Sequence, residues 1–290
     1  MAARPTRIIA AGLAAVLCVV VVQGRQPRPR RIISLVPALT EMLFAIGAGS
    51  SLMAVSSFDA FPPEVKPLPR VGALLDPDTE RILSMRPDLV LIYGSQADLK
   101  GQLARAGIQA FEYRHGGLNH VTATMRELGT VTGYQTDANR AADTIERNLA
   151  AVSARVRGRP RPRTLLVFGR EPLSLRNLYA SGGVGFLHDL VNLCGGTNVF
   201  GESERESVQV STEMLLARAP EVILELRVGD APDAGQMRRE LEPWQRLQSV
   251  PAVRTGRVHI LHGDHLVVPG PRIAQAAEEI GKALHPDAFK

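Results

Sequence analysis

The histidines and one glycine-rich segment are the first places in this chain to look for chemistry. His262 and His265 enclose a Gly-Asp pair, and this spacing lacks both the helical i, i+4 arrangement and the glutamate of a zinc hydrolase. The segment Ser181–Gly185 reads Ser-Gly-Gly-Val-Gly. Such glycines can cradle a phosphate at a helix N-terminus, but the dinucleotide fingerprint is not matched, and a tight loop at a cleft edge is expected instead. Gly94-Ser95 lacks the second glycine of a nucleophile elbow. We therefore predict no catalytic residue, no metal site and no cofactor.

The N-terminus has the pattern of an export signal. A basic start, Met1–Arg7, precedes an apolar run of about 15 residues, Ile8–Val22, which is shorter than the roughly 20 residues of a membrane-spanning helix. We predict that residues 1–30 are a signal peptide and leader and that the mature protein is periplasmic. The signal is either cleaved or retained as a membrane anchor. Leu17 is too large for the usual residue before a lipidated cysteine, which disfavours lipidation of Cys18.

The composition is that of an ordinary globular protein. The 290 residues are 45% hydrophobic and 22% charged, which is enough chain for two domains of about 100 to 150 residues. The formal net charge of +5 largely reflects six arginines among the first 31 residues, where no acid occurs. The rest is nearly neutral, which argues against nucleic acid as a partner, because phosphate binding needs a concentrated basic face. Cys194 is the only cysteine beyond the signal, so we expect a buried thiol and no internal disulfide.

A repeated segment indicates two lobes of one architecture. Thr79–Leu91 reads TERILSMRPDLVL and Thr212–Leu224 reads TEMLLARAPEVIL. Each copy predicts a short helix, a proline break and a buried strand. Because the copies lie nearly half the chain apart, we expect two similar lobes with a cleft between them that can hold a ligand.

Alternating strand and helix patterns place both copies in parallel βα units. The N-terminal α/β lobe is predicted over residues 31–133 and the C-terminal α/β lobe over residues 163–290. Helices are expected at Thr40–Ile46 and from Arg272 to Leu284. The main strands are expected at Ile32–Val36, Leu52–Ser56, Leu89–Tyr93, Gln109–Tyr113, Leu165–Phe168, Glu221–Leu226 and Val258–Leu261.

A long helix is predicted between the lobes. Asp137–Val156 contains neither glycine nor proline and places apolar residues at helical spacing. This helix is about 30 Å long at 1.5 Å per residue, and the interlobe segment is predicted at 134–158. A rigid helix in place of a flexible linker should restrict hinge motion.

Several segments together resemble a known family. They read RIISLVPALTEMLFAIGAG, SSFDAFPPEV, DPDTERILSMRPDLVL, LVFG, LVNLCGGTNVF, VSTEMLLARAPEVIL and PGPRIAQAAEEIGKAL. In this order they resemble periplasmic substrate-binding proteins of the vitamin B12 (cobalamin), siderophore and haem class, and the similarity is greatest to the cobalamin-binding members. The resemblance implies two Rossmann-like lobes joined by a single long α-helix, little motion between states, and delivery of a metal chelate to an inner-membrane ABC transporter permease by a monomer.

Within that family, one carboxylate per lobe docks onto arginines of the transporter. By position these carboxylates would be Glu80 and Glu213. Helix capping offers a second explanation, because Asp78 and Ser211 are ordinary N-cap residues and an acid in the first turn is favoured by about 0.3 to 1 kcal/mol. Capping accounts for either glutamate alone but not by itself for the matched pair, which duplication of an ancestral lobe could also explain.

The resemblance also implies an aromatic cleft around a large planar ligand. Aromatic residues make up only 4% of the chain, and the single tryptophan, Trp244, lies outside the expected positions. The polar turn Tyr-Gly-Ser-Gln after a buried strand favours exposure of Tyr93 to the cleft. Core packing remains an alternative for the phenylalanines. The predicted ligand-binding residues are Phe58, Phe61, Tyr93, Phe168, Tyr179 and Asp264.

Two other ligands of the same fold stay open. Haem would favour an axial ligand among Tyr93, Tyr179, His115 and His265. A ferric siderophore would favour anion contacts from Arg170, Arg176 and Arg227. A corrinoid would need neither set, and a corrinoid is the ligand we predict. An exported enzyme with no transport role is the remaining alternative.

Overall fold

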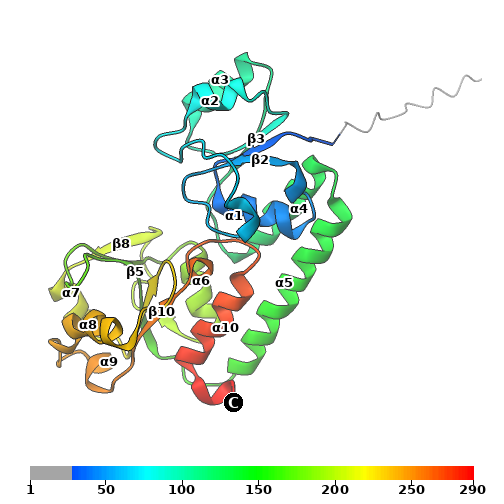
Figure 1. Cartoon of the computed structure of the whole chain (residues 1–290). Coiled ribbons are helices and arrows are strands. Elements are labelled where there is room, and N and C mark those ends of the chain that lie inside the picture. The colour runs from blue at the N-terminus through cyan, green and yellow to red at the C-terminus, as the bar shows by residue number, and fades with distance from the viewer. Residues whose placement is uncertain (1–27) are drawn as a thin grey trace, which may run out of the picture.

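A computed structural model describes residues 28–290 of the chain. The predicted export segment therefore lies outside the described residues. Within 28–290, no helix combines the length and the apolar character needed to cross a membrane. Figure 1 shows two lobes that are stacked along one long helix.

The N-terminal lobe is built on a four-stranded parallel sheet. Its order is β2-β1-β3-β4, and β1, β2 and β3 are mainly apolar because helices cover both faces of the sheet. The helix after β1 starts three residues before the expected Thr40, because Pro37 occupies the first helical turn, where its missing N–H costs nothing. The elements are β1 (Ile32–Ser34), α1 (Pro37–Ala45), β2 (Leu52–Val55), α2 (Thr79–Ser84), β3 (Leu89–Tyr93), α3 (Ala97–Arg105) and β4 (Gln109–Tyr113).

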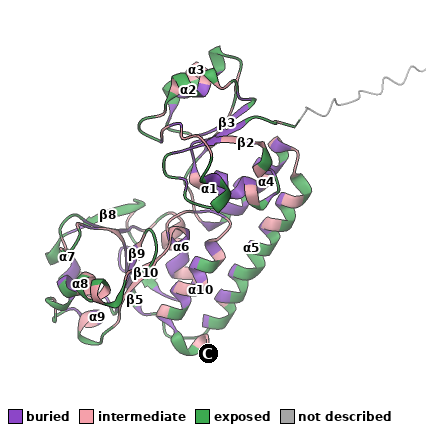
Figure 2. Ribbon diagram, viewed as in Figure 1, coloured by how far each residue is buried: buried purple, intermediate pink, exposed green. Residues whose placement is uncertain are grey.

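A helical hairpin carries the chain from one lobe to the other. It consists of α4 (Leu118–Thr132) and α5 (Gln135–Val156), whose 22 residues confirm the predicted long helix. A β-carbon on Gly129 would lie 2.2 Å from that of Ala138, so only glycine allows the two helices to approach this closely. The C-terminal helix α10 (Ile273–Leu284) packs against α5, and Figure 2 shows buried residues along the facing sides of both helices.

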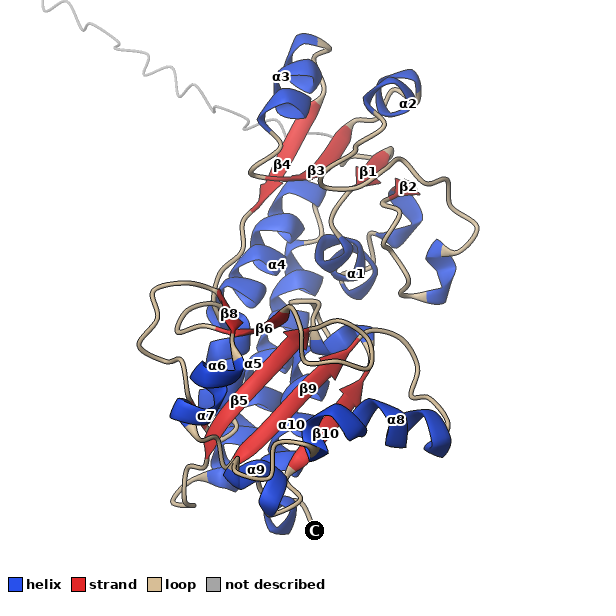
Figure 3. Cartoon of the chain, turned by 90° about the vertical axis from the view of Figure 1, so that its left-hand side faces the viewer, coloured by secondary structure: helices blue, strands red, loops and turns tan. Residues whose placement is uncertain are grey.

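The C-terminal lobe departs from the all-parallel expectation. Its sheet has the order β10-β9-β5-β6-β8, with β7 beside β5, and strands β6 and β8 run antiparallel to their neighbours. Neither of these two short strands was predicted. Figure 3 shows the parallel part of the sheet in full view. The elements are β5 (Arg163–Gly169), β6 (Leu178–Ser181), α6 (Phe186–Leu193), β7 (Thr197–Asn198), β8 (Ser207–Val210), α7 (Thr212–Arg218), β9 (Val222–Arg227), α8 (Ala234–Gln245), α9 (Pro251–Arg254) and β10 (Val258–His262).

The polar segment Asp230–Trp244 is mostly helical, which the sequence did not predict. Asp233 begins α8 by accepting hydrogen bonds from the amides of Gly235 and Gln236. The helix buries Pro243 and Trp244 near its C-terminus and exposes most other positions, so its apolar stripe is too sparse to recognise by periodicity.

Three arginines stabilise the ends of helices: two of them follow α5, and the third directly precedes β10. Arg161 Nη2 donates to the carbonyl of Gly196 at 2.6 Å, just after α6, and Arg163 Nη2 donates to that of Arg218, the last residue of α7. Arg257 Nη2 donates to the carbonyl of Leu284, the last residue of α10. Cationic donors are favourable at helix C-termini. These three arginines therefore stabilise the fold itself.

The two copies of the repeated segment keep the same local geometry. Asp78 accepts a hydrogen bond from the amide of Arg81, and Ser211 accepts one from the amide of Met214, so both are N-caps as expected. The residue before each repeat proline is left-handed, with φ of 46° at Arg86 and 43° at Ala219. Both copies end their helix with the same turn.

Candidate functional site

A cavity between the lobes lies at the carboxyl end of β5. Its volume is about 370 Å³. The N-terminal lobe contributes the loop after β4, and the C-terminal lobe contributes the end of β5 and the N-terminus of α6. We call it the Phe168 cavity, and its lining residues include His115, Gly116, Phe168, Val184, Phe186 and Val267.

A second cavity of about 220 Å³ contains three of the predicted ligand-binding residues. We call it the Phe61 cavity. Phe58 and Phe61 line it from the loop after β2, and Asp264 lines it from the loop after β10. Phe58 is 76% exposed, which is unusual for an aromatic side chain unless something covers it. The Asp264 carboxylate is held in place by the amide of Gly229, at 2.9 Å.

The two cavities form one cleft. Val228 and Val267 line both, and Val228 is 70% exposed on the C-terminal lobe. The cleft is mainly apolar, with polar groups at its edges, as is usual for small-molecule sites.

An ion pair between the lobes adjoins the cleft. Arg272 Nε donates to Glu41 Oε2 at 2.9 Å, and Arg272 Nη2 donates to Glu41 Oε1 at 2.5 Å. The guanidinium of Arg272 lies 3.9 Å from the ring centroid of Phe61, a cation–π contact that orients this aromatic. Burial raises the pKa of Glu41, and the hydrogen bond from Arg272 opposes that shift.

A second polar contact ties the lobes together. The Asp189 carboxylate on α6 accepts a hydrogen bond from the amide of Leu118, at the start of α4, at 2.9 Å. With the Glu41–Arg272 pair and the packing of α5, this contact limits how far the lobes can separate.

Tyr93 and Tyr179 do not line the cleft. Tyr93 is half-buried at the end of β3, where it stacks on His115 with centroids 5.9 Å apart, so it supports a residue that lines the Phe168 cavity. Burial raises the pKa of Tyr93. Tyr179 is 40% exposed on β6 and contacts neither cavity. The roles of both tyrosines in binding stay predictions.

The glycine-rich segment bounds the Phe168 cavity. A β-carbon on Gly182 would lie 2.0 Å from the carbonyl oxygen of Arg205, and one on Gly183 would lie 2.4 Å from that of Gly201. The glycines therefore let two backbone segments approach closely. Gly185, with φ of 89°, lines the cavity itself, so this segment is the tight loop at the cleft edge that the sequence predicted.

The predicted docking glutamates lie on the short helices of the repeat. Glu80 is exposed in the first turn of α2, and Glu213 is exposed in the first turn of α7. A hydrogen bond from Ser211 holds the pKa of Glu213 below its usual value. Figures 1 and 3 show α2 and α7 on different lobes.

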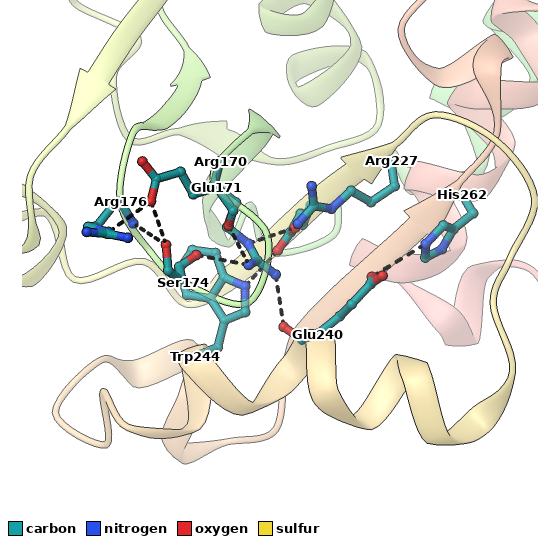
Figure 4. A network of polar contacts seen from close by, with 9 residues as sticks. Arg170, Glu171, Ser174, Arg176, Arg227, Glu240, Trp244 and His262 are labelled. Atoms are coloured by element: carbon teal, nitrogen blue, oxygen red, sulfur yellow. Dashed lines mark hydrogen bonds and ion pairs between the residues drawn. The ribbon is translucent and has the colours of Figure 1, made fainter.

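The arginines proposed for an anionic siderophore are largely engaged. Arg170 has no exposed side chain and donates from Nε to Glu225 at 2.9 Å, and Arg227 also pairs with Glu225, at 2.6 Å. Figure 4 shows this cluster, in which Trp244 Nε1 donates to the same carboxylate at 2.7 Å. Arg176 pairs with Glu171 on the surface.

The histidines do not form a metal site. His265 pairs with Glu279 at 2.9 Å and is buried, and His262 points toward Glu240 at 3.6 Å. No group of three or more potential metal-ligating His, Cys, Asp or Glu residues occurs within 28–290. Cys194 is buried, and burial raises the pKa of its thiol to about 12, which confirms a structural thiol.

The sequence reasoning missed polar lining residues of the cleft, such as Glu41, Glu206 and Arg272, and several aliphatic ones. Val184, Val228 and Val267 line it from loops whose polar neighbours hide them. These valines are recognisable as site residues only because they are exposed in loops although they are apolar, and a single sequence does not reveal exposure.

Two lobes joined by one long helix, with a cleft at the carboxyl ends of their strands, define a class of ligand-binding proteins. The sequence matches the periplasmic binding protein family over residues 32–265, and the chain belongs to that family.

Two relatives match this chain over most of its length. The vitamin B12-binding protein of Salmonella typhimurium is 32% identical over 256 residues, which are 88% of this chain and 90% of that protein. The vitamin B12-binding protein of Pectobacterium carotovorum is 31% identical over 260 residues, 88% of each chain.

Solved structures agree on the fold. The periplasmic vitamin B12 binding protein BtuF of Vibrio cholerae superposes with a TM-score of 0.75 at 25% identity, covering 91% of this chain and 99% of that one. A periplasmic haem-binding protein of Pseudomonas aeruginosa superposes with a TM-score of 0.76 at 24% identity, covering 89% and 94%. This second likeness shows the fold alone.

Proposed function

We propose that this protein captures a corrinoid, most simply cobalamin, in the cleft between its lobes and delivers it to an inner-membrane ABC transporter permease. The observation that carries this proposal is the 32% identity, over 88% of the chain, to a vitamin B12-binding protein. The apolar cleft supports it, because Phe58, Phe61 and Phe168 present aromatic surface from both lobes.

Binding is non-covalent and needs little motion. The Glu41–Arg272 pair and the Asp189–Leu118 contact hold the lobes near one another before a ligand arrives. A largely preformed cleft lowers the ordering cost of binding. Asp264 faces the Phe61 cavity, where its carboxylate can accept hydrogen bonds from the amide groups of a corrinoid.

Delivery uses the two exposed glutamates. Glu80 and Glu213 each present a carboxylate from the first turn of a helix, one on each lobe. We propose that both pair with arginines of the permease. The basic N-terminus with its apolar run would export the chain to the periplasm, where it would act as a monomer.

Titration with candidate ligands tests the proposal. The purified protein is titrated with cyanocobalamin, haemin and a ferric catecholate by calorimetry, with ligand absorbance recorded in parallel. We expect cyanocobalamin to bind in a one-to-one ratio, and haemin and the catecholate to bind at least about tenfold more weakly. Tight binding of haemin alone, with a shifted Soret band, would overturn the assignment.

One observation favours haem as the second candidate. His115 is exposed, lines the Phe168 cavity and is stacked on Tyr93, so an imidazole nitrogen is available as an axial ligand for haem iron. If haemin binds, His115→Ala should abolish the Soret shift.

A further inference from the structure

A third cavity adjoins the cleft and has no part in the function proposed above. Its volume is about 540 Å³, and it lies beside α8 in the C-terminal lobe. It meets the cleft at Val228, which lines all three cavities. We call it the Arg227 cavity, and its lining residues include Leu173, Arg227, Asp230, Arg239, Glu240 and His262.

The cavity lies at the carboxyl edge of the sheet. Arg170 directly follows β5, Arg227 ends β9, and His262 ends β10. His262 and Arg227 are register partners on adjacent parallel strands, so their side chains emerge on the same face. This edge is where open α/β sheets bind ligands.

A hydrogen-bonded frame holds the cavity wall in place. Glu225 accepts from Arg170, Arg227 and Trp244 at 2.6 to 2.9 Å. Arg170 Nη2 also donates to the backbone carbonyl of Glu240 at 2.9 Å, which fixes α8 against the strands (Figure 4). Each member of this frame is buried or half-buried, so the wall is preorganised.

Two buried polar atoms of the wall, Arg227 Nε and Glu240 Oε2, make no hydrogen bond within the described residues 28–290. Glu240 Oε2 faces His262 Nε2 at 3.6 Å, which is too long for a hydrogen bond. Part of each side chain is exposed, 23% for Arg227 and 17% for Glu240, and both residues line the cavity, so an occupant can contact them. An unpaired buried donor or acceptor costs about 1–3 kcal/mol, and an occupant that pairs both recovers that cost.

The two atoms define the chemistry of the occupant. Arg227 can only donate and Glu240, when ionised, can only accept. A carboxylate would meet repulsion at Glu240, and a cation would meet repulsion at Arg227. A neutral group with a carbonyl oxygen and an N–H satisfies both, and a primary carboxamide is the smallest group that has them.

We propose that the Arg227 cavity is a subsite for one carboxamide arm of the bound ligand. This inference rests on the proposed corrinoid function, because corrinoids carry several amide side arms whereas haem carries carboxylates. Arg227 donates to the amide carbonyl and Glu240 accepts from the amide nitrogen. The subsite therefore selects an amidated arm over the corresponding acid.

Cyanocobalamin derivatives with one side-chain amide hydrolysed to the acid test this subsite. Calorimetry compares each monocarboxylic isomer with cyanocobalamin on the wild-type protein and on Glu240→Gln. Glu242→Gln is the matched control, because Glu242 lies on the same helix, is exposed and pairs with Arg246 on the surface. We expect at least one isomer to bind the wild type about tenfold or more weakly, and Glu240→Gln to remove most of that difference while Glu242→Gln keeps it.

Two outcomes would overturn the subsite. One is equal binding of all isomers by the wild type, and the other is the same discrimination in Glu240→Gln as in Glu242→Gln. Failure of cyanocobalamin itself to bind would remove the proposed function as well, so the two failures are distinguishable.

Discussion

The two copies of the repeated segment match closely until their strands end, and there they differ. In the alignment of the copies, Ile92 on β3 corresponds to Glu225 on β9, and Gly94 corresponds to Arg227. Ile92 is fully buried among apolar residues, whereas Glu225 is equally buried among two arginines and a tryptophan. The same architecture therefore carries an apolar core in one lobe and a buried ionic cluster beside a cavity in the other.

This difference separates the part of the repeat that forms the helix and turn from the part that differs in function between the lobes. The caps, the left-handed residue and the proline are shared, so they form the helix and turn. The strand ends are not shared: Arg227 at the end of β9 lines the Arg227 cavity, whereas Tyr93 at the end of β3 only supports His115 in the wall of the Phe168 cavity. A buried ion cluster gains little stability over a well-packed apolar one, so its presence points to the cavity it frames.

The largest expected effect comes from reversing the charge of the glutamate on each of the two docking helices. Glu80→Lys together with Glu213→Lys should abolish uptake of labelled cyanocobalamin by host cells, because both carboxylates would then repel the permease arginines. Affinity for cyanocobalamin should be unchanged. Glu127→Lys with Glu204→Lys, two exposed acids outside these two helices, is the control. Normal uptake in the first double variant would end the docking proposal.

The next largest effect comes from making the C-terminal copy resemble the N-terminal one. Glu225→Ile should lower the free energy of unfolding by about 3–5 kcal/mol, because Arg170 and Arg227 are left buried without their carboxylate. Urea unfolding measures this loss. Adding Arg170→Met and Arg227→Met should restore most of the stability, and a triple variant no more stable than the single one would contradict this account of the cluster.

A smaller effect is expected for Glu41, a buried carboxylate of the N-terminal lobe. Burial raises its pKa in the folded protein, so its contribution to stability is present below the unfolded pKa of about 4.3 and is lost as pH rises through the folded value. The stability of the wild type relative to Glu41→Gln should therefore fall as pH rises from about 4 to 7.

Urea unfolding at a series of pH values measures that trend. Glu127→Gln, which removes an exposed acid on α4, is the control measured in parallel. A wild type that gains stability over Glu41→Gln as pH rises would mean that the pair with Arg272 outweighs burial.

The smallest effect probes what the copies share. Arg86→Gly and Ala219→Gly should each raise the free energy of unfolding by roughly 0.5–1 kcal/mol, because glycine adopts the left-handed conformation without a Cβ clash. Thermal unfolding checks both. A gain in one copy and a loss in the other would show that the two turns are not equivalent.

Much of the fold followed from local patterns. Apolar strands such as Leu89–Tyr93 and Gln109–Tyr113 were predicted with the bounds that the structure has. The elements that were missed have weak local signals: β6 and β8 are short antiparallel additions, and α8 buries only Pro243 and Trp244. Their stability comes from tertiary contacts that no window of sequence contains.

The site was predicted in part for the same reason. Residues at strand ends and in the proline-rich loop, such as Phe168 and Phe61, line the cleft because topology places them there. The loop valines and the pairing of Glu41 with Arg272, 231 residues apart, depend on how the lobes meet. Only the assembled structure brings those residues together.

Binding of cyanocobalamin to cleft variants tests the central claim most directly. The dissociation constant is measured by calorimetry for the wild type, for Phe58→Ala in the N-terminal lobe and for Phe168→Ala in the C-terminal lobe. Leu75→Ala is the control, since Leu75 is 94% exposed and lines none of the three cavities. A ligand held between the lobes predicts that each phenylalanine variant binds about tenfold or more weakly while Leu75→Ala binds normally. Unchanged affinity in both phenylalanine variants would contradict it.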